Sequence, residues 1–280
     1  MLIIDAQVHI WQANSPQRPW PAGRHAAHRP TPITAEDLIV EMNQAGVDAA
    51  VLVPPSWEGE RNDLVLAASA KHPERFVAMG RVDPDDPAAS ASIASWRAHP
   101  RAMGLRFAFH RAWQIDALND GRLETVWASA AAANVPVMIL IAQARLDLVA
   151  AIAERHPRLS IVLDHLAVPS SVPLQERFTN LHRLTGLERY PNIAVKASAL
   201  PCLATDEYPY RSLHDPLRRV IDAFGPQRVL WGSDLSRLPC TYQQAVTMFT
   251  EEMPWLSSSD LALIMGRAIN ERFGLQFQEK

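Results

Sequence analysis

The run Val137-Met138-Ile139-Leu140-Ile141 gives the clearest indication of the fold. All five residues are apolar, and Val137, Ile139 and Ile141 are β-branched, which favours a strand. Successive residues of a strand point to opposite faces, so a strand that is apolar throughout is buried on both faces. Such strands are typical of parallel sheets that helices cover on either side.

Similar apolar runs recur along the chain and alternate with segments of helical periodicity. Strands are predicted near residues 2–9, 48–53, 75–82, 103–108, 136–141, 159–164, 192–197 and 228–231. Helices are predicted near residues 60–71, 118–133, 145–155, 210–224, 241–251 and 258–267. A further helix is expected to begin at Thr34, which can form a capping box with Asp37, and to end at Gly46. About eight strand–helix units predict a single domain over residues 1–280, a slightly distorted (β/α)8 TIM barrel.

An open, doubly wound sheet is the alternative to this barrel. That fold favours a glycine-rich phosphate loop after the first strand, and the stretch from Gln7 to Trp20 contains no glycine. The chain has 280 residues, of which 48% are hydrophobic. This length suits one barrel, since α/β barrels often have about 250 residues in one domain.

Charge and composition narrow the class of function. The net charge of −3 comes with no sustained basic run, so the sequence predicts no nucleic-acid partner. It also lacks an apolar run of the roughly 18 residues that a membrane span requires. Met1 leads directly into a strand, without the pattern of a secretory signal, and the only cysteines, Cys202 and Cys240, do not suggest a disulfide framework. We therefore expect a cytoplasmic protein whose partner is a small molecule.

The first predicted strand, Ile3-Ile4-Asp5-Ala6-Gln7-Val8-His9-Ile10-Trp11, carries two polar residues near its end. Gln7 and His9 are two positions apart and should share a face. Two histidines at these positions would form a metal clamp, whereas a neutral carboxamide is a poor ligand for zinc-like ions. Gln7 thus favours a site that holds no metal and needs no cofactor.

Polar side chains also mark the ends of later strands. The residues at or just beyond the C-terminal end of a different predicted strand are His9, Arg106, His165, Lys196 and Asp234. A barrel brings such positions together in one pocket, which makes them candidate site residues. Taken singly, His165 could be a hydrogen-bonded structural residue, Asp164 beside it a turn former, and Arg106 a paired core arginine.

Two stretches do not fit the strand–helix repeat. Residues 12–33 are rich in proline and contain Trp20 and His28, and residues 198–214 form a second irregular segment. Loops that follow barrel strands crowd the C-terminal mouth, where active sites lie. Both segments are therefore candidate lids, with plain surface loops as the alternative.

Together these segments resemble the lactonase-like branch of the amidohydrolase superfamily. The resemblance rests on the first strand and on Gly104-Leu105-Arg106-Phe107, Leu163-Asp164-His165-Leu166, Val195-Lys196-Ala197-Ser198, Trp231-Gly232-Ser233-Asp234 and Asn270-Glu271-Arg272-Phe273, and it spans roughly residues 2–275. That branch usually has Asp-x-His-x-His in its first strand, and Gln7 stands where the first of these histidines would be. The resemblance implies a hydrolase, and the pyrone-dicarboxylate lactonases of the branch work without a metal.

We expect metal-independent hydrolysis of a cyclic ester, a lactone, in a small carboxylated substrate. Asp234 would act as general base for water, and His9 and Gln7 would hold that water in line. His165 and Lys196 would donate to the carbonyl oxygen. Arg106 would bind the substrate carboxylate through a bidentate fork, and Trp11 with Trp20 would provide an apolar wall.

Three other interpretations remain open. A metal-dependent hydrolase could use His9, His165 and Asp234, with Gln7 as a weak fourth ligand. A decarboxylase of a small aromatic acid would fit related branches of the superfamily, although those keep the metal clamp. The third is a binding protein that has lost catalysis. Retention of a carboxylate facing histidines argues against that last alternative.

Overall fold

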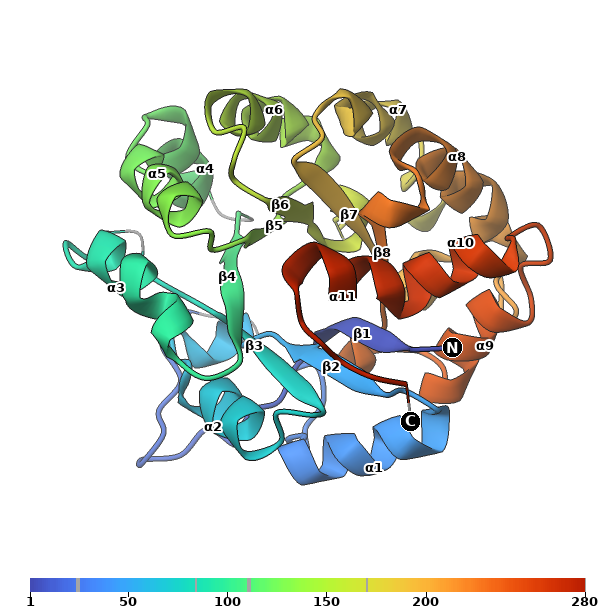
Figure 1. The fold of residues 1–280 in the computed structure, drawn as a ribbon, viewed down its shortest axis with the longest axis horizontal. Coiled ribbons are helices and arrows are strands. Elements are labelled where there is room, and N and C mark those ends of the chain that lie inside the picture. The colour runs from blue at the N-terminus through green and yellow to red at the C-terminus, as the bar shows by residue number, and fades with distance from the viewer. Residues whose placement is uncertain (24–25, 84, 110–111, 170, 280) are drawn as a thin grey trace.

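Eight parallel strands form one sheet in chain order, and helices surround it (Figure 1). The computed structural model describes residues 1–23, 26–83, 85–109, 112–169 and 171–279. The strands are β1 (Ile4–Val8), β2 (Ala49–Leu52), β3 (Phe76–Gly80), β4 (Ala102–Ala108), β5 (Val137–Leu140), β6 (Ile161–Leu163), β7 (Ile193–Ser198) and β8 (Val229–Gly232). All eight lie within about three residues of their predicted positions, and the TIM barrel is confirmed.

The helices fill the intervals between strands. They are α1 (Ala35–Ala45), α2 (Asp63–Lys71), α3 (Ala89–Ser95), α4 (Ala112–Asn119), α5 (Glu124–Ala132), α6 (Leu146–Arg155), α7 (Leu181–Thr185), α8 (His214–Phe224), α9 (Tyr242–Thr250), α10 (Ser258–Ala262) and α11 (Ala268–Phe273). Thr34 and Asp37 form the expected capping box of α1, and Gly46 ends that helix in the left-handed conformation.

The helices differ from the predicted ones at four places. The segment 118–133 is two helices, because Gly121 adopts a φ of 76° and breaks the chain direction between α4 and α5. Helices α3 and α7 were not predicted, since α3 is rich in serine and alanine and α7 is only five residues long. The last helical segment runs beyond residue 267, through a π-helical turn at Leu263–Arg267 and on into α11.

Two apolar layers hold the barrel together. The outer layer packs the strands against the helices and includes Leu105 and Val137. The inner layer fills the barrel with side chains such as Met138 and Leu230. The C-terminal residues Leu275 and Phe277 belong to the same layer. Figure 1 shows α11 and the C-terminal segment crossing the front of the sheet, on the side where the chain begins. The opposite end, where the strands finish, remains for a site.

The barrel is distorted at β1. Its pairing with β2 shifts register between Asp5 and Val8, which is a β-bulge. Ala6 lies in the inner layer and Val8 in the outer layer, yet Gln7 contacts the inward-facing Lys196. The bulge therefore turns Gln7 inward, with His9 beside it, although regular alternation would place Gln7 opposite Ala6.

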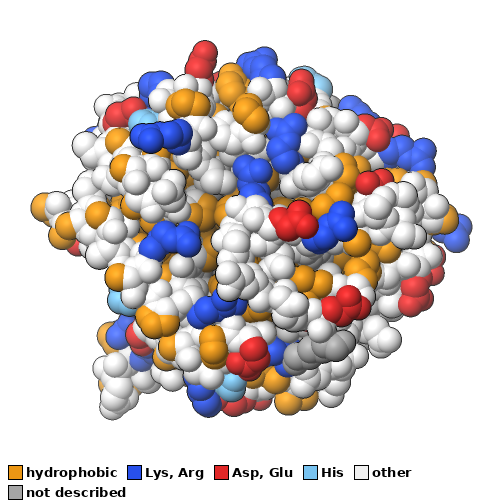
Figure 2. Space-filling model, in the orientation of Figure 1, with side chains coloured by type: hydrophobic (Ala, Val, Ile, Leu, Met, Phe, Trp, Pro, Cys, Tyr) orange, Lys and Arg blue, Asp and Glu red, His pale blue; other side chains and the backbone are white. Residues whose placement is uncertain are grey.

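The face of the molecule in Figure 2 carries no large patch of one charge. Basic and acidic side chains are interspersed there among the residues shown in colour. Within the described ranges no helix is both long and apolar enough to cross a bilayer.

Candidate active site

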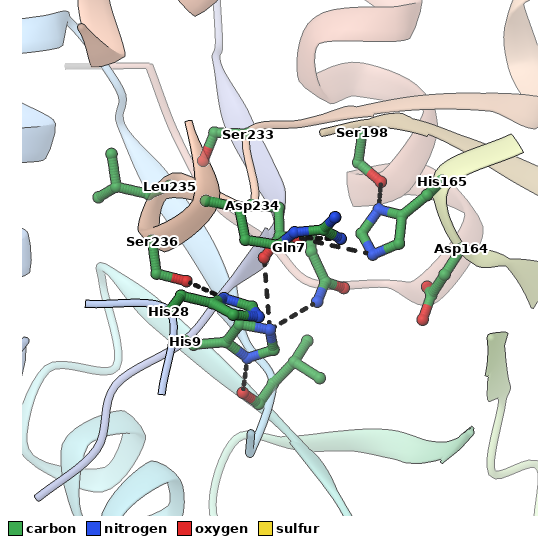
Figure 3. A network of polar contacts seen from close by, with 12 residues as sticks. Gln7, His9, His28, Asp164, His165, Ser198, Ser233, Asp234, Leu235 and Ser236 are labelled. Atoms are coloured by element: carbon green, nitrogen blue, oxygen red, sulfur yellow. Dashed lines mark hydrogen bonds and ion pairs between the residues drawn. The ribbon is translucent and has the colours of Figure 1, made fainter. Parts of the chain in front are cut away.

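Three of the five predicted strand-end residues, His9, His165 and Asp234, face one another at the C-terminal mouth (Figure 3). Nε2 of His9 lies 3.3 Å from Oδ1 of Asp234, and Nε2 of His165 lies 3.7 Å from the other oxygen, Oδ2. Deeper in the barrel, Asp164 pairs with Arg106 at 3.1 Å and with Lys196 at 2.9 Å. The side chains of all these residues are at most 5% exposed. The strand-end side chains therefore lie close together, and their joint role in one substrate pocket stays a prediction.

The backbone adopts the left-handed conformation just after three of the strands. Asp234 has φ 55°, His165 has φ 52° and Ala199 has φ 54°, directly after β8, β6 and β7. For residues other than glycine this conformation costs about 1–3 kcal/mol each, and such strain clusters at functional sites. The amide of Asp234 donates to the carbonyl of Gln7 at 2.9 Å, which fixes the acid relative to β1.

Asp5 joins β1 to β8 beneath this site, a role that the sequence did not indicate. It is fully buried, and its carboxylate accepts from the amides of Gln7 and Ser233 at 2.9 Å and from the Tyr242 hydroxyl at 2.6 Å. Burial raises the pKa of Asp5 to about 6, against the lowering effect of these hydrogen bonds. Gly232 is needed at this seam, because a Cβ there would lie 3.1 Å from the Gln7 nitrogen.

Lys196 lies among polar side chains of the protein itself. Its ammonium group donates to Oε1 of Gln7 at 2.6 Å and to Sδ of Met138 at 2.8 Å, and it lies 2.9 Å from Oδ1 of Asp164. These contacts hold Gln7 and Asp164 in position, and donation by Lys196 to a substrate carbonyl stays a prediction.

Arg106 is buried inside the barrel, and Leu105 faces the helices. Nε of Arg106 contacts Oδ2 of Asp164, so the residue braces the barrel through a carboxylate of the protein. Asp164 stands between the two cations Arg106 and Lys196, whose charges hold its pKa well below the ordinary value although burial alone would raise it. One carboxylate cannot neutralise both cations, so anchoring of a substrate anion by Arg106 stays a prediction.

Trp11 does not line the mouth. It is 1% exposed and packs edge-on against Trp57, with ring centroids 5.4 Å apart. Trp57 is the aromatic residue next to the polar site, since its ring lies 5.8 Å from that of His9 and 4.7 Å from that of His28. Trp57 is therefore the aromatic side chain beside the site, with Trp11 packed behind it, and the substrate wall of Trp11 and Trp20 stays a prediction. Trp57 lies in the loop that follows β2, in a short turn at Ser56–Glu58, and this position after a strand is the signal that could have revealed it.

The segment 12–33 reaches the mouth, apart from residues 24 and 25, which lie outside the described ranges. Its His28 contacts the Ser236 hydroxyl through Nδ1 at 2.8 Å, and Arg29 donates to the carbonyl of Leu235 at 2.7 Å. The site thus gains a histidine that the strand-end argument could not find. The second lid candidate, 198–214, touches the site at its first residue, where Ser198 hydrogen-bonds Nδ1 of His165 at 2.8 Å.

The charges of the site follow from burial. Burial lowers the pKa of His9 and lowers that of His165 to about 4, although Asp234 acts in the opposite direction on both. Burial would raise the pKa of Asp234, but His165, His9 and Arg237 hold it below its ordinary value. Of these, the Arg237 guanidinium, 3.5 Å from Oδ2, keeps its charge at neutral pH. At neutral pH an ionised carboxylate therefore faces neutral imidazoles.

One group of side chains in the described ranges has the spacing of a metal site. His9, His28 and Asp234 offer ligand atoms that all lie within 4.8 Å of one another. Oδ1 of Asp234 is buried and has no hydrogen-bond partner among the described residues, so it can accept a cation. The group differs from the predicted alternative, because His28 stands in it where His165 was expected. The donors present fit a zinc-like ion.

Comparison with known proteins places this geometry in a family. The amidohydrolase family model matches residues 4–267. An L-fucono-1,5-lactonase of Burkholderia ambifaria is 31% identical, over 84% of this chain and 81% of the relative. A 4-sulfomuconolactone hydrolase of Hydrogenophaga intermedia is 24% identical, over 82% and 73% respectively. A Burkholderia multivorans amidohydrolase solved with bound zinc has a TM-score of 0.81 at 20% identity and covers 98% of this chain and 99% of its own. Matched over nearly its whole length, the chain belongs to the amidohydrolase family.

Proposed function

We propose that the protein hydrolyses a lactone, opening the cyclic ester of a small carboxylated substrate without requiring a metal. The lactone-hydrolysing names of two relatives support the reaction class. The observation that carries the mechanism is Oδ1 of Asp234, which is buried at the mouth and has no hydrogen-bond partner among the described residues. An ionised carboxylate with an unused lone pair is suited to accept a proton from water.

His9 supports this role by its hydrogen bonding. Nδ1 of His9 donates to the carbonyl of Val53 at 2.6 Å, so the neutral ring carries its lone pair on Nε2. Nε2 accepts from the carboxamide nitrogen of Gln7 at 3.4 Å and lies 3.3 Å from Oδ1 of Asp234. A water molecule that donates a hydrogen to Oδ1 would lie beside this ring, with its lone pairs turned toward a substrate in the mouth.

The proposed reaction balances with these groups alone. The water oxygen bonds to the lactone carbonyl carbon while its proton passes to Oδ1 of Asp234. The ring C–O bond then breaks, and the leaving alkoxide takes that proton, which yields a hydroxy acid and restores the carboxylate. His165 and Arg237 are the proposed donors to the carbonyl oxygen as it becomes negative, since Lys196 already contacts Gln7, Met138 and Asp164.

The substrate carboxylate is assigned to Arg106. Its guanidinium and the Lys196 ammonium share the single carboxylate of Asp164. A buried guanidinium whose only ion-pair partner among the described residues is shared with a second cation favours an anionic substrate.

Metal-dependent hydrolysis of the same kind of substrate is the second candidate, and the spacing of His9, His28 and Asp234 favours it. Those residues would hold a zinc-like ion, which would supply Lewis acidity and acidify water. A panel of carboxylated lactones, assayed with protein freed of metal by a chelator and checked by elemental analysis, separates the two. Turnover by the metal-free protein supports the proposal, and turnover that appears only after an ion is restored contradicts it.

A further inference from the structure

The end of the barrel opposite the mouth contains a cavity that takes no part in the proposed reaction. It has a volume of about 440 Å³ and lies where β5 and β6 begin, against the ends of α5 and α11. Figure 2 shows this end of the molecule, with basic side chains around a hollow. Three of the described residues that line the cavity are arginines, Arg97, Arg158 and Arg272, and none is acidic. The lining therefore carries positive charge.

Arg272 brings a guanidinium to this cavity that forms no ion pair within the described ranges. It lies on α11, in the segment Asn270-Glu271-Arg272-Phe273. Its Nη2 donates to the carbonyl of Asn192 at 3.2 Å, whereas its Nε is buried and has no hydrogen-bond partner among the described residues. Burial lowers the pKa of Arg272, and the nearby cation Arg228 acts in the same direction. An anion in the cavity would give this buried donor an acceptor.

Ser160 supplies a second buried group without a partner. Its Oγ makes no hydrogen bond within the described part of the chain, and the residue directly precedes β6. Arg158, two positions earlier, is exposed and has neither a side-chain hydrogen bond nor an ion pair there. Arg97 is tied to the loop before β5, because its Nη1 donates to the carbonyl of Asn134 at 3.3 Å. The cavity thus combines three guanidinium groups with an unused hydroxyl.

We propose that this cavity binds a small organic anion, a carboxylate or phosphate ester carried on an apolar body. A guanidinium presents its donors as a planar fork that matches either oxyanion. The unpartnered Nε of Arg272 and hydroxyl of Ser160 are donors for the same head group. Arg97 and Arg158 add charge at the cavity wall.

The other walls of the cavity indicate the apolar part of this ligand. Ala133, Pro136 and Phe273 line it together with the arginines. Sites for small organic molecules typically have volumes of about 300–1,000 Å³ and combine apolar walls with a few polar groups. A bare inorganic ion would leave these walls in contact with water, so an anion with an apolar body fits better.

Binding would join α11 to the starts of two strands. The carbonyl of Ser160 accepts from the amide of Val137, the first residue of β5, at 2.9 Å. The carbonyl of Asn192 accepts from the amide of Ile161, the first residue of β6, at 2.9 Å, and also from Arg272. An anion held by Ser160 and Arg272 together should therefore stabilise this end of the barrel, since a ligand that binds only the folded state raises its stability.

Calorimetric titration of the full chain with phenyl phosphate, benzoate and neutral phenol tests the site. Phenyl phosphate or benzoate should bind, and Arg272→Gln should weaken that binding by about ten- to 100-fold, the range for a hydrogen bond to a charged group. Arg183→Gln is the matched control, because it removes the same charge from an exposed position on α7, and it should bind as the wild type does. Equal affinity in the wild type and Arg272→Gln would overturn the proposal, as would equally tight binding of phenol.

Ser160→Ala separates binding from folding, since Arg272 also bonds the carbonyl of Asn192. Removing a buried hydroxyl that has no partner should leave the stability of the free protein unchanged or higher. The same variant should bind phenyl phosphate about tenfold more weakly, because it lacks one donor to a charged group. Wild-type affinity in Ser160→Ala would overturn the site.

Hydrogen exchange locates the bound anion. Phenyl phosphate should slow amide exchange in peptides that cover residues 130–136, 158–161 and 268–273, and this protection should be lost in Arg272→Gln. Protection confined to the mouth, in peptides around residues 232–238, would assign the anion to the candidate active site and overturn the proposal. None of these measurements uses a lactone, so their outcome is independent of the proposed reaction.

Discussion

Nζ of Lys196 donates to Oε1 of Gln7 at 2.6 Å, deep inside the barrel. The carboxamide nitrogen of the same Gln7 lies 3.4 Å from Nε2 of His9. Gln7 therefore links the buried Lys196–Asp164 pair to the histidine beside the proposed base. A carboxamide suits this position because it provides an acceptor for the ammonium and a donor for the imidazole at once.

Lys196→Met is expected to destabilise the fold strongly. It removes the cation that pairs with Asp164 and leaves the Gln7 oxygen unpaired, and breaking a buried ion pair costs roughly 3–5 kcal/mol. Urea unfolding measures the free energy. Lys71→Met is the control, because Lys71 is 62% exposed in its pair with Glu36, and such surface pairs contribute at most about 1 kcal/mol. A Lys196→Met protein of wild-type stability that has lost only turnover would support the predicted role as a substrate donor.

Asp234→Asn should reduce kcat by about 10²- to 10⁴-fold, since it keeps the shape of the side chain and removes the proton acceptor. The wild-type rate should not fall between pH 7 and pH 5, because the pKa of Asp234 lies below its ordinary value of 3.8 and the carboxylate stays ionised. Steady-state kinetics on a carboxylated lactone measure both effects. Turnover within a few-fold of wild type would show that Asp234 is structural.

The positions of the strands could be predicted from the sequence, because each strand is an apolar run. The run at 136–141 is apolar throughout, and the polar residues that end the strands, such as His165 and Asp234, occur where a parallel barrel gathers them. The helix break at Gly121 was not predicted, because a glycine within a helical pattern can also be tolerated as a helical residue.

The missed site residues depend on long-range contacts. His28 lies in an irregular, proline-rich segment, and only its contact with Ser236, 208 residues away, brings it to the mouth. Asp5 looked like part of a strand pattern, and its function as the acceptor that joins β1 to β8 depends on Ser233 and Tyr242. The inward turn of Gln7 needs a bulge, which residue alternation does not indicate.

Substitution of Arg106 separates substrate anchoring from bracing. If Arg106 binds the substrate carboxylate, Arg106→Lys should raise KM less than Arg106→Ala does, because it keeps the charge but not the planar fork. The loss of a buried charged partner costs on the order of 2–5 kcal/mol. KM for carboxylated lactones and for their methyl esters should be compared alongside Tm. Variants that melt early yet bind the acid normally would assign Arg106 to its contact with Asp164 alone.

Asp5→Asn should change how stability depends on pH. The pKa of Asp5 is about 6 in the folded protein and has an ordinary value of 3.8, so the folded state binds this proton more tightly than the unfolded state does. The resulting stabilisation is fully present below pH 3.8 and is lost as the pH rises through 6. One pKa unit corresponds to about 1.4 kcal/mol, which gives a contribution on the order of 3 kcal/mol for this fully buried group.

The asparagine variant cannot titrate, so the wild type should lose stability relative to it between pH 4 and pH 6.5. Asparagine also offers fewer acceptors to Ser233 and Tyr242, which should lower stability by a similar amount at every pH. Urea unfolding at several pH values measures the difference in free energy. Asp222→Asn, at an exposed position on α8, serves as the control and should show no such trend. A free-energy difference between wild type and Asp5→Asn that stays constant over this range would mean that Asp5 keeps its ordinary pKa and that its hydrogen bonds fully offset its burial.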